Sequence, residues 1–171
     1  KAISLSEDEV RLLSRKAARE ADQTHRVAPA ENPYCKRLDR LVGPHQQASG
    51  RSFSYKVYLE PRVNAFAMAD GTIRVYSGLM DLMNDQELLF VIGHEMGHVL
   101  EEHVKEKMIV ALLGSALRKG VASQQNMVGE LARSSLGGFL ERFVSARFSQ
   151  EEEKAADDHA LAFMQRHGYD P

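Results

Sequence analysis

The spacing of apolar and polar residues predicts helices toward both ends of the chain. Apolar side chains recur every three to four residues over residues 6–22 and 84–100, which places them on one face of a helix. Ser6 and Asn84 open these runs, and each is followed three residues later by a glutamate, the capping-box pattern of a helix start. A proline in the first turn predicts a further helix over residues 33–43.

Between these helices the pattern changes to that of β-strands. Strict alternation marks a half-buried strand at residues 53–59. Two further β-type runs flank Asp70-Gly71, which favours a tight two-residue turn, so we predict a hairpin over residues 64–76. The first hairpin strand, residues 64–69, is small and apolar. It is either packed as an ordinary sheet strand or exposed as an edge that pairs with an extended peptide.

The second half of the chain has a mainly helical pattern. A short helix is expected at residues 77–83, and a last helix begins at Ser149 and ends before Gly168. Residues 107–148 are helical in pattern but interrupted by glycines. They form either two helices with a flexible joint that covers a functional site or a plain helical hairpin of the core. The whole pattern predicts one α+β, mainly helical domain over residues 1–171.

Composition excludes several classes of protein. A hydrophobic content of 43% is typical of a globular domain. The net charge of −2 argues against nucleic acid as a partner, because such proteins carry a basic excess. The longest apolar run, residues 108–113, is too short to span a membrane. The single cysteine, Cys35, forms no internal disulfide and no thiolate metal site.

The chemistry of the chain is concentrated in His94-Glu95-Met96-Gly97-His98, an H-E-x-x-H sequence. On a helix, positions i and i+4 share a face, so His94 and His98 can both ligate one zinc ion. Glu95 lies close enough to act on a water molecule at that zinc. Gly93 and Gly97 flank the ligands, and either helix packing or the close approach of another backbone explains them.

A peptidase zinc site needs a third protein ligand from another element. Glu153 and Asp157 lie one turn apart on the last helix, in line with its apolar residues, so both carboxylates are expected to be buried. We predict Glu153 as the third ligand and Asp157 as an acceptor behind a ligating imidazole. The alternatives are His103, which is turned off the ligand face of the motif helix, and His159.

The sequence does not identify the donor that stabilises the oxyanion of the transition state. Tyr55, Tyr76 and Arg74 are candidates on their chemistry alone. The physiological substrate, the cleavage preference and the oligomeric state are likewise left open by the sequence.

Together these motifs resemble the HtpX / CAAX-prenyl-protease family of zinc metallopeptidases, which are gluzincins, and within it the soluble bacterial LoiP-type branch. The stretches that carry the resemblance are residues 63–67, Gly71, residues 75–80, residues 91–98 and the E-x-x-x-D sequence from Glu153 to Asp157. The resemblance implies a zincin-like fold with a small β-sheet beside the motif helix. It implies one zinc ion held by His94, His98 and Glu153.

The resemblance also implies roles for other residues and a function. Glu95 would be the catalytic acid and base, Asp157 a functional residue described in the family as a proton donor, and residues 64–69 the edge that aligns the substrate. The implied protein is a metalloendopeptidase of the bacterial cell envelope that acts on unfolded or membrane-associated proteins in quality control. Its expected location is the periplasm, either free or as an outer-membrane-anchored lipoprotein, and the sequence leaves open whether a lipid anchor was present.

Two features depart from the family pattern. The usual Glu-Ala-Asp of the second motif is replaced by Ala155-Ala156-Asp157, which leaves both predicted site residues of that helix in place. Family members continue beyond Pro171 with a segment that bears His and Arg near the site, so we expect either a C-terminally truncated chain or one whose tail was removed. Because the chain begins at Lys1 without methionine or an apolar leader, we also expect a processed product.

Two functions of other classes are also consistent with the sequence. The first is an inactive zinc module that holds partner proteins along the same sheet edge. The second is a helical interaction domain in which the H-E-x-x-H sequence is accidental. Glu95 argues against the inactive module, because metal binding alone has no use for that carboxylate.

Overall fold

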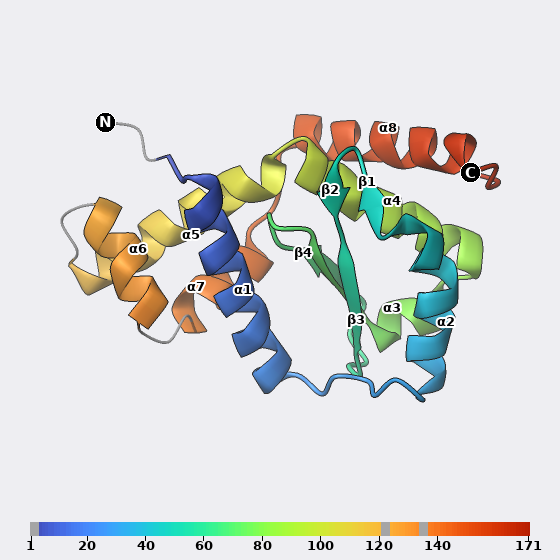
Figure 1. Ribbon diagram of the computed structural model, residues 1–171, viewed down its shortest axis with the longest axis horizontal. Coiled ribbons are helices and arrows are strands. Elements are labelled where there is room, and N and C mark those ends of the chain that lie inside the picture. Colours follow the sequence, from blue (N-terminus) through green and yellow to red (C-terminus); the bar gives the residue numbers. More distant parts are fainter. Residues whose placement is uncertain (1–3, 121–123, 134–136) are drawn as a thin grey trace.

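The computed structural model describes residues 4–120, 124–133 and 137–171, and Figure 1 shows how the elements are arranged. Its helices are α1 (Glu7–Thr24), α2 (Pro33–Val42), the 3-10 helix η1 (Gly43–His45), α3 (Ser77–Leu82), α4 (Asp85–Leu100), α5 (His103–Lys119), α6 (Gln124–Arg133), α7 (Gly137–Ser145) and α8 (Gln150–Arg166). Its strands are β1 (Gln47–Ala48), β2 (Arg51–Ser52), β3 (Ser54–Tyr58), β4 (Ala65–Ala67) and β5 (Thr72–Tyr76). The prediction of a mainly helical α+β fold is confirmed.

The predicted helix starts are confirmed at the level of individual hydrogen bonds. Ser6, Asn84 and Ser149 each accept a hydrogen bond from the backbone N–H three residues on, and the glutamate at that position bonds back to the cap. Such reciprocal bonds satisfy two backbone donors that the helix itself leaves without partners. Local sequence therefore sets where α1, α4 and α8 begin.

A small mixed sheet lies against the helix that carries the H-E-x-x-H sequence. Its strand order is β3-β5-β4, with β5 parallel to β3 and antiparallel to β4. Every residue of β5 is buried, as expected for the central strand. Strand β4 is an edge strand and packs on α4 (Figure 1), so the sheet brings one free edge beside the motif helix.

The predicted hairpin exists, but the expected two-residue turn is wrong. Gly71 has a φ of +91°, whereas Asp70 does not adopt a positive φ. The N–H of Gly71 donates to the Met68 carbonyl oxygen over 3.0 Å, and the Met68 N–H donates to the Thr72 carbonyl oxygen over 2.7 Å. This is the three-residue connection in which a glycine in the left-handed region follows a turn. The same glycine also lets Ser52 approach, since a Cβ there would lie 2.1 Å from the Ser52 oxygen.

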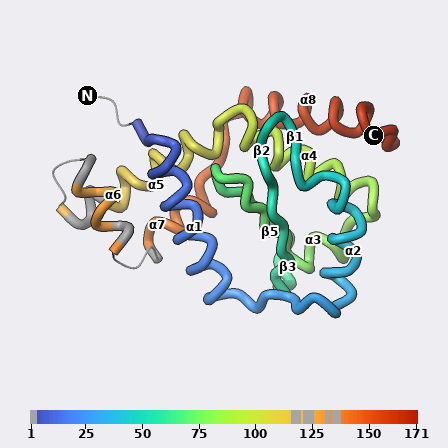
Figure 2. The backbone as a smooth tube through the Cα atoms, in the orientation of Figure 1, coloured from blue at the N-terminus to red at the C-terminus, as the bar shows by residue number. Residues whose placement is uncertain are grey.

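Helices α4 and α8 run side by side along one side of the molecule, as Figures 1 and 2 show. A Cβ at Gly93 would lie 2.9 Å from the Phe163 ring, and a Cβ at Gly97 would lie 2.9 Å from the Cβ of His159. The backbone of α8 is also near, since a Cβ at Gly93 would lie 3.3 Å from Cα of Ala160 and one at Gly97 would lie 3.2 Å from Cα of Ala156. Both explanations left open by the sequence therefore apply, because the helices pack through a close approach of the α8 backbone. The effect of the two glycines is to let α8 approach the ligand face of α4.

Within the described residues, the run over 107–148 forms three helices, not two. Helices α5, α6 and α7 gather at one end of the molecule in Figure 2, and α1 contacts both α6 and α7. Phe139, Phe143 and Met108 are buried in the common core. The sequence predicts a single flexible joint within this run, and residues 121–123 and 134–136 of the run lie outside the described part of the chain. Within the part of the chain that is described, no helix is both long and apolar enough to cross a membrane.

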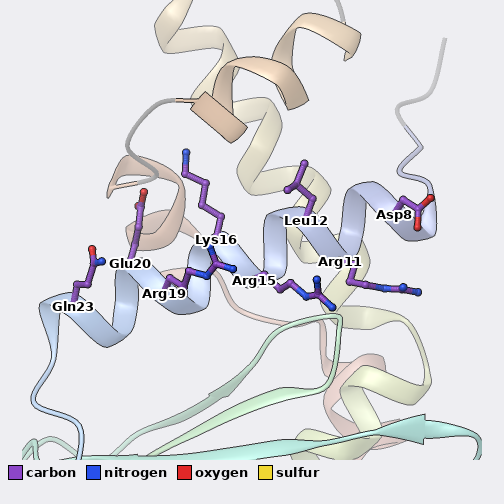
Figure 3. A pocket seen from close by; sticks show the side chains of 8 residues that line it. All are labelled: Asp8, Arg11, Leu12, Arg15, Lys16, Arg19, Glu20 and Gln23. Carbon is purple, nitrogen blue, oxygen red and sulfur yellow. The ribbon is translucent and has the colours of Figure 1, made fainter.

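Helix α1 joins these helices to the sheet. Its apolar stripe, Val10, Leu13, Ala17 and Ala21, is buried as predicted. Figure 3 shows its other side, where the side chains of Asp8, Arg11, Leu12, Arg15, Lys16, Arg19, Glu20 and Gln23 line an open hollow of about 630 Å³.

The end of α1 is anchored to the sheet by an ionic cluster around Asp22. Asp22 accepts hydrogen bonds from the Tyr58 hydroxyl over 2.6 Å and from Nε of Arg74 over 2.9 Å. Lys56 donates to the same carboxylate over 3.1 Å. Burial would raise the pKa of Asp22, but the hydrogen bonds from Arg74 and Tyr58 hold it below its usual value. Because Arg74 is only 4% exposed, this cluster fixes α1 to strands β3 and β5.

Candidate metal and catalytic centre

The two histidines of the H-E-x-x-H sequence point to the same place from adjacent turns of α4. Their Nε2 atoms are 3.0 Å apart, and their ring planes are nearly perpendicular, at 84°. The His98 side chain is 1% exposed and the His94 side chain 18%. The predicted i, i+4 arrangement is thus formed, with one ring deep in the protein and the other at the edge of the site.

Glu153 reaches this place from the first turn of α8. Its Oε2 lies 3.1 Å from Nε2 of His94, and its Oε1 lies 3.7 Å from Nε2 of His98. Ligand atoms of the three residues lie within 4.8 Å of one another, and no other such group occurs in the described residues. Metal–ligand distances near 2 Å in a tetrahedral site would separate two ligand atoms by about 3.3 Å. The donor set and its spacing therefore match a single metal ion.

The protonation of the site also favours a cation. Nδ1 of His94 lies 2.8 Å from Oδ1 of Asp157, which accepts when ionised, so a neutral His94 carries its proton on Nδ1. Its Nε2 then presents a lone pair. Burial, together with the nearby His94 and His103, lowers the pKa of His98 to about 3, so this ring is neutral at neutral pH. The Nε2 lone pair of His94 thus faces the carboxylate of Glu153, an arrangement that a bound cation stabilises.

The two carboxylates of α8 are less buried than their sequence positions suggest. The side chain of Glu153 is 46% exposed and that of Asp157 is 58% exposed. The expectation that both are buried is therefore wrong. Their partners are as expected, however, because Asp157 lies behind His94 and Glu153 lies in front of it.

Neither alternative ligand occupies the convergence point of the three ligand atoms. His103 begins α5 and contacts the opposite edge of the His98 ring, with 3.1 Å between the two Nδ1 atoms. His159 lies on α8 with its Nδ1 3.0 Å from the Gly93 carbonyl oxygen. The structure thus assigns His159 to the contact between the two helices.

Glu95 lies at the wall of a cavity of about 410 Å³ that also includes the three potential ligands and residues 64–67 of the β4 edge. Burial raises the pKa of the Glu95 carboxyl to about 8. The positive charge of Lys107 opposes this rise, and the negative charge of Glu153 adds to it. A carboxyl group at this place can act as a base when ionised and as an acid when protonated.

The three candidates for an oxyanion donor are engaged elsewhere. The Tyr55 hydroxyl donates to the His45 carbonyl oxygen over 2.8 Å, and the Tyr76 hydroxyl lies 3.3 Å from Nε2 of His25. Arg74 is bound to Asp22 in the ionic cluster. Their alternating sequence pattern already placed them in strands, but only the packing shows that their polar ends do not reach the cavity.

Sequence reasoning missed five residues that line the cavity, namely Lys107, Val144, Ala146, Arg147 and Phe148, and two of these contact the aromatic rings of the site. Phe148 stacks on the His98 ring, with 3.7 Å between ring centres and 15° between planes. Lys107 places its Nζ 4.5 Å from the centre of the Phe148 ring. Both lie in the poorly patterned run over residues 107–148, and the helical period alone could not show that they face the site.

A convergent pair of histidines and a glutamate, set beside the edge of a small sheet in a mainly helical domain, is characteristic of zincin-like metalloendopeptidases, and this chain is one. Comparison with known proteins identifies the family. Residues 29–171 match the model of peptidase family M48, and the chain belongs to that family.

Three relatives define its place in the family. Over 171 residues the chain is 46% identical to the metalloprotease LoiP of Escherichia coli, covering 99% of this chain and 68% of LoiP. It is 36% identical over 169 residues to the metalloprotease YcaL of the same organism, covering 98% of this chain and 66% of YcaL. Identity to the β-barrel assembly-enhancing protease of Yersinia pestis is 30% over 154 residues, which is 84% of this chain and 31% of that protein. The LoiP-type resemblance is confirmed, and the chain spans about two thirds of LoiP and YcaL.

Proposed function

We propose that the chain is a zinc endopeptidase, with one zinc ion held by His94, His98 and Glu153. The observation that carries this proposal is the convergence of the three ligand atoms within 4.8 Å, in a cavity that Glu95 also lines. When bound there, zinc supplies Lewis-acid polarisation of the scissile carbonyl and lowers the pKa of water.

Glu95 and Asp157 have different tasks in this proposal. Glu95 accepts the proton of the attacking water and later donates it to the departing amine. Asp157 accepts the Nδ1–H hydrogen bond of His94 and so keeps the Nε2 lone pair of that ring directed at the metal position. A proton-donor role for Asp157 is less well supported, because its carboxylate bonds to the far side of the His94 ring.

The β4 edge is the proposed binding site for an extended peptide substrate. In the antiparallel pairing of β4 with β5, Phe66 lies opposite Arg74, and the flanking bonds join Asn64 to Tyr76 and Met68 to Thr72. The alternation of such pairs directs the backbone groups of Ala65 and Ala67 away from β5. These groups can form hydrogen bonds with the main chain of a peptide beside Glu95, whatever side chains the peptide carries.

Main-chain recognition suits substrates that are unfolded or that expose an extended segment. We therefore propose unfolded or membrane-associated proteins as substrates and the bacterial cell envelope as the place of action, with a role in protein quality control. The relative named as a β-barrel assembly-enhancing protease supports this assignment.

The decisive variant is Glu95→Gln, which keeps the shape of the side chain and removes the base. Cleavage of casein should fall at least about 100-fold, since general acid and base catalysis contributes 10²–10⁴-fold, while zinc content by metal analysis stays at one per chain. Glu101→Gln is the matched control, because it makes the same change at an exposed residue just beyond the same helix. Cleavage by Glu95→Gln equal to that of the control would refute the proposed mechanism.

Substrate pairing with β4 is tested by Ala65→Pro. Proline removes an N–H that points to the free edge and is tolerated in edge strands. The variant should raise KM for casein peptides about 10-fold, the equivalent of one lost hydrogen bond of about 1.4 kcal/mol, and should bind zinc normally. An unchanged KM would show that the substrate does not pair with this edge.

A further inference from the structure

His103 reaches His98 because the chain changes direction between α4 and α5. Helix α4 ends at Leu100, and Glu102 adopts a φ of +63°, a conformation that is unfavourable for a residue with a side chain. The turn is held by the Glu102 N–H, which donates to the Val99 carbonyl oxygen over 3.1 Å. A continuous helix would have rotated His103 away from His98. The turn instead returns its ring to the buried edge of the His98 ring.

The His98 ring is confined on three sides by different elements. Its face is covered by Phe148, its Nε2 points toward His94 and Glu153, and its Nδ1 lies 3.1 Å from Nδ1 of His103. With its side chain only 1% exposed, the ring has no access to bulk water for the Nδ1 group. A buried ring N–H needs an acceptor, and His103 is placed where that acceptor is needed.

The two potential ligand rings therefore have acceptors of different charge. His94 donates to a carboxylate, that of Asp157, over 2.8 Å. His98 faces an imidazole, and a neutral imidazole accepts through one nitrogen only when its proton is on the other. A carboxylate adds a negative charge near the site, which already contains Glu95 and Glu153, whereas a neutral imidazole orients the ring without adding charge.

We propose that His103 is a positioning residue for the metal site. Its Nδ1 accepts the Nδ1–H hydrogen bond of His98, which holds His98 in the tautomer whose Nε2 lone pair faces the metal position and fixes the plane of the ring. This inference rests on the proposed zinc site, because the tautomer matters only if Nε2 of His98 binds a metal.

Two substitutions separate the acceptor from the volume of the side chain. The Oδ1 of asparagine occupies nearly the place of Nδ1 of histidine, so His103→Asn keeps an acceptor, whereas His103→Leu removes it. Zinc dissociation constants measured by competition with a chelator should rise about 10- to 100-fold for His103→Leu. His103→Asn should stay within about 3-fold of the unmodified chain, because it still orients the ligand.

Val104→Ala is the control for a purely structural role. Val104 is the next residue of α5 and is buried, so its truncation loosens the same helix while the His103 side chain is retained. This variant should unfold more easily but bind zinc as tightly as the unmodified chain. The absorption spectrum of the cobalt-substituted protein should change for His103→Leu and remain unchanged for Val104→Ala.

A direct measurement on the unmodified chain does not depend on any variant folding. Long-range proton–nitrogen NMR of the zinc-loaded protein should show the proton of His98 on Nδ1 and that of His103 on Nε2. A proton on Nδ1 of His103 would overturn the proposal, as would zinc affinity and a cobalt spectrum that His103→Leu leaves unchanged. In either case zinc binding by the unmodified chain would still support the proposed function, whereas a chain that binds no zinc would refute that function first.

Discussion

The Asp22 cluster and the metal cluster are both assembled from charged and polar side chains of several elements, but their charges are matched in different ways. Asp22 receives hydrogen bonds from Tyr58, Arg74 and Lys56, so acceptor meets donor throughout. At the metal cluster, Nε2 of His94 lies 3.1 Å from the carboxylate of Glu153, and in a neutral His94 this nitrogen carries a lone pair. The first arrangement stabilises the fold by itself, whereas the second needs a cation.

This difference separates structural from functional polar clusters in the same molecule. Buried polar groups normally have complementary partners, because an unmatched one destabilises the folded state. A cluster in which acceptors converge keeps that arrangement only because packing around it is strong, as at Gly93 and Gly97, where α8 approaches α4 closely. The comparison therefore predicts opposite responses of the two clusters to mutation.

The largest expected effect is that of Glu153→Ala on metal binding. Loss of a ligand should weaken zinc binding at least about 1,000-fold, since even residues that only orient ligands contribute 10- to 100-fold. In the metal-free chain, the same variant should change the free energy of unfolding by less than about 0.5 kcal/mol, because it removes a repulsive acceptor. Chelator competition measures the zinc affinity, and urea unfolding measures the stability of the metal-free chain. A large loss of stability without metal would mean that Glu153 stabilises the fold directly.

The second effect is the loss of stability in Asp22→Asn. Removal of this charge leaves the buried Arg74 guanidinium without its counter-ion and should lower the free energy of unfolding by about 3 kcal/mol. Zinc affinity should remain unchanged. The matched control is Asp158→Asn, whose partner Lys154 is exposed, and which should cost less than about 1 kcal/mol. Urea unfolding of the unmodified chain and of both variants measures these changes. Equal stability of Asp22→Asn and Asp158→Asn would contradict a structural role for the Asp22 cluster.

The smallest expected effect is a change with pH in the loss of unfolding free energy that Asp22→Asn causes. The pKa of Asp22 is lowered in the folded state, so its contribution to stability is fully present above the unfolded pKa of about 4. It is lost as the pH falls through the lower, folded pKa. The gap in unfolding free energy between the unmodified chain and Asp22→Asn should thus be constant from pH 7 to about pH 5 and shrink below about pH 4. A gap that grows in acid would contradict the assigned direction.

Much of the metal site could be predicted from sequence because its parts are local. His94 and His98 lie one helical turn apart, and so do Glu153 and Asp157, so each pair follows from the period of the helix. The capping residues Asn84 and Ser149 define where each helix begins and hence which face each pair occupies. Short-range geometry of this kind depends little on the rest of the fold.

Other features depended on contacts between distant parts of the chain. Nearby sequence does not indicate the parallel pairing of β3 with β5 or the exposure of Asp157. It also does not indicate that Lys107 and Phe148 approach His98. The helical periodicity of the sequence also does not predict the positive φ of Glu102, which brings His103 back to His98.

The amino-acid sequence by itself therefore determined the helix starts, the paired ligand positions and the class of chemistry. Only the tertiary structure decided which residues surround the metal position and which apparent candidates, such as Tyr55 and Arg74, are engaged elsewhere. The physical reason is that hydrogen bonds within a helix link residues four apart, whereas the direction of each buried polar group depends on the packing of whole elements.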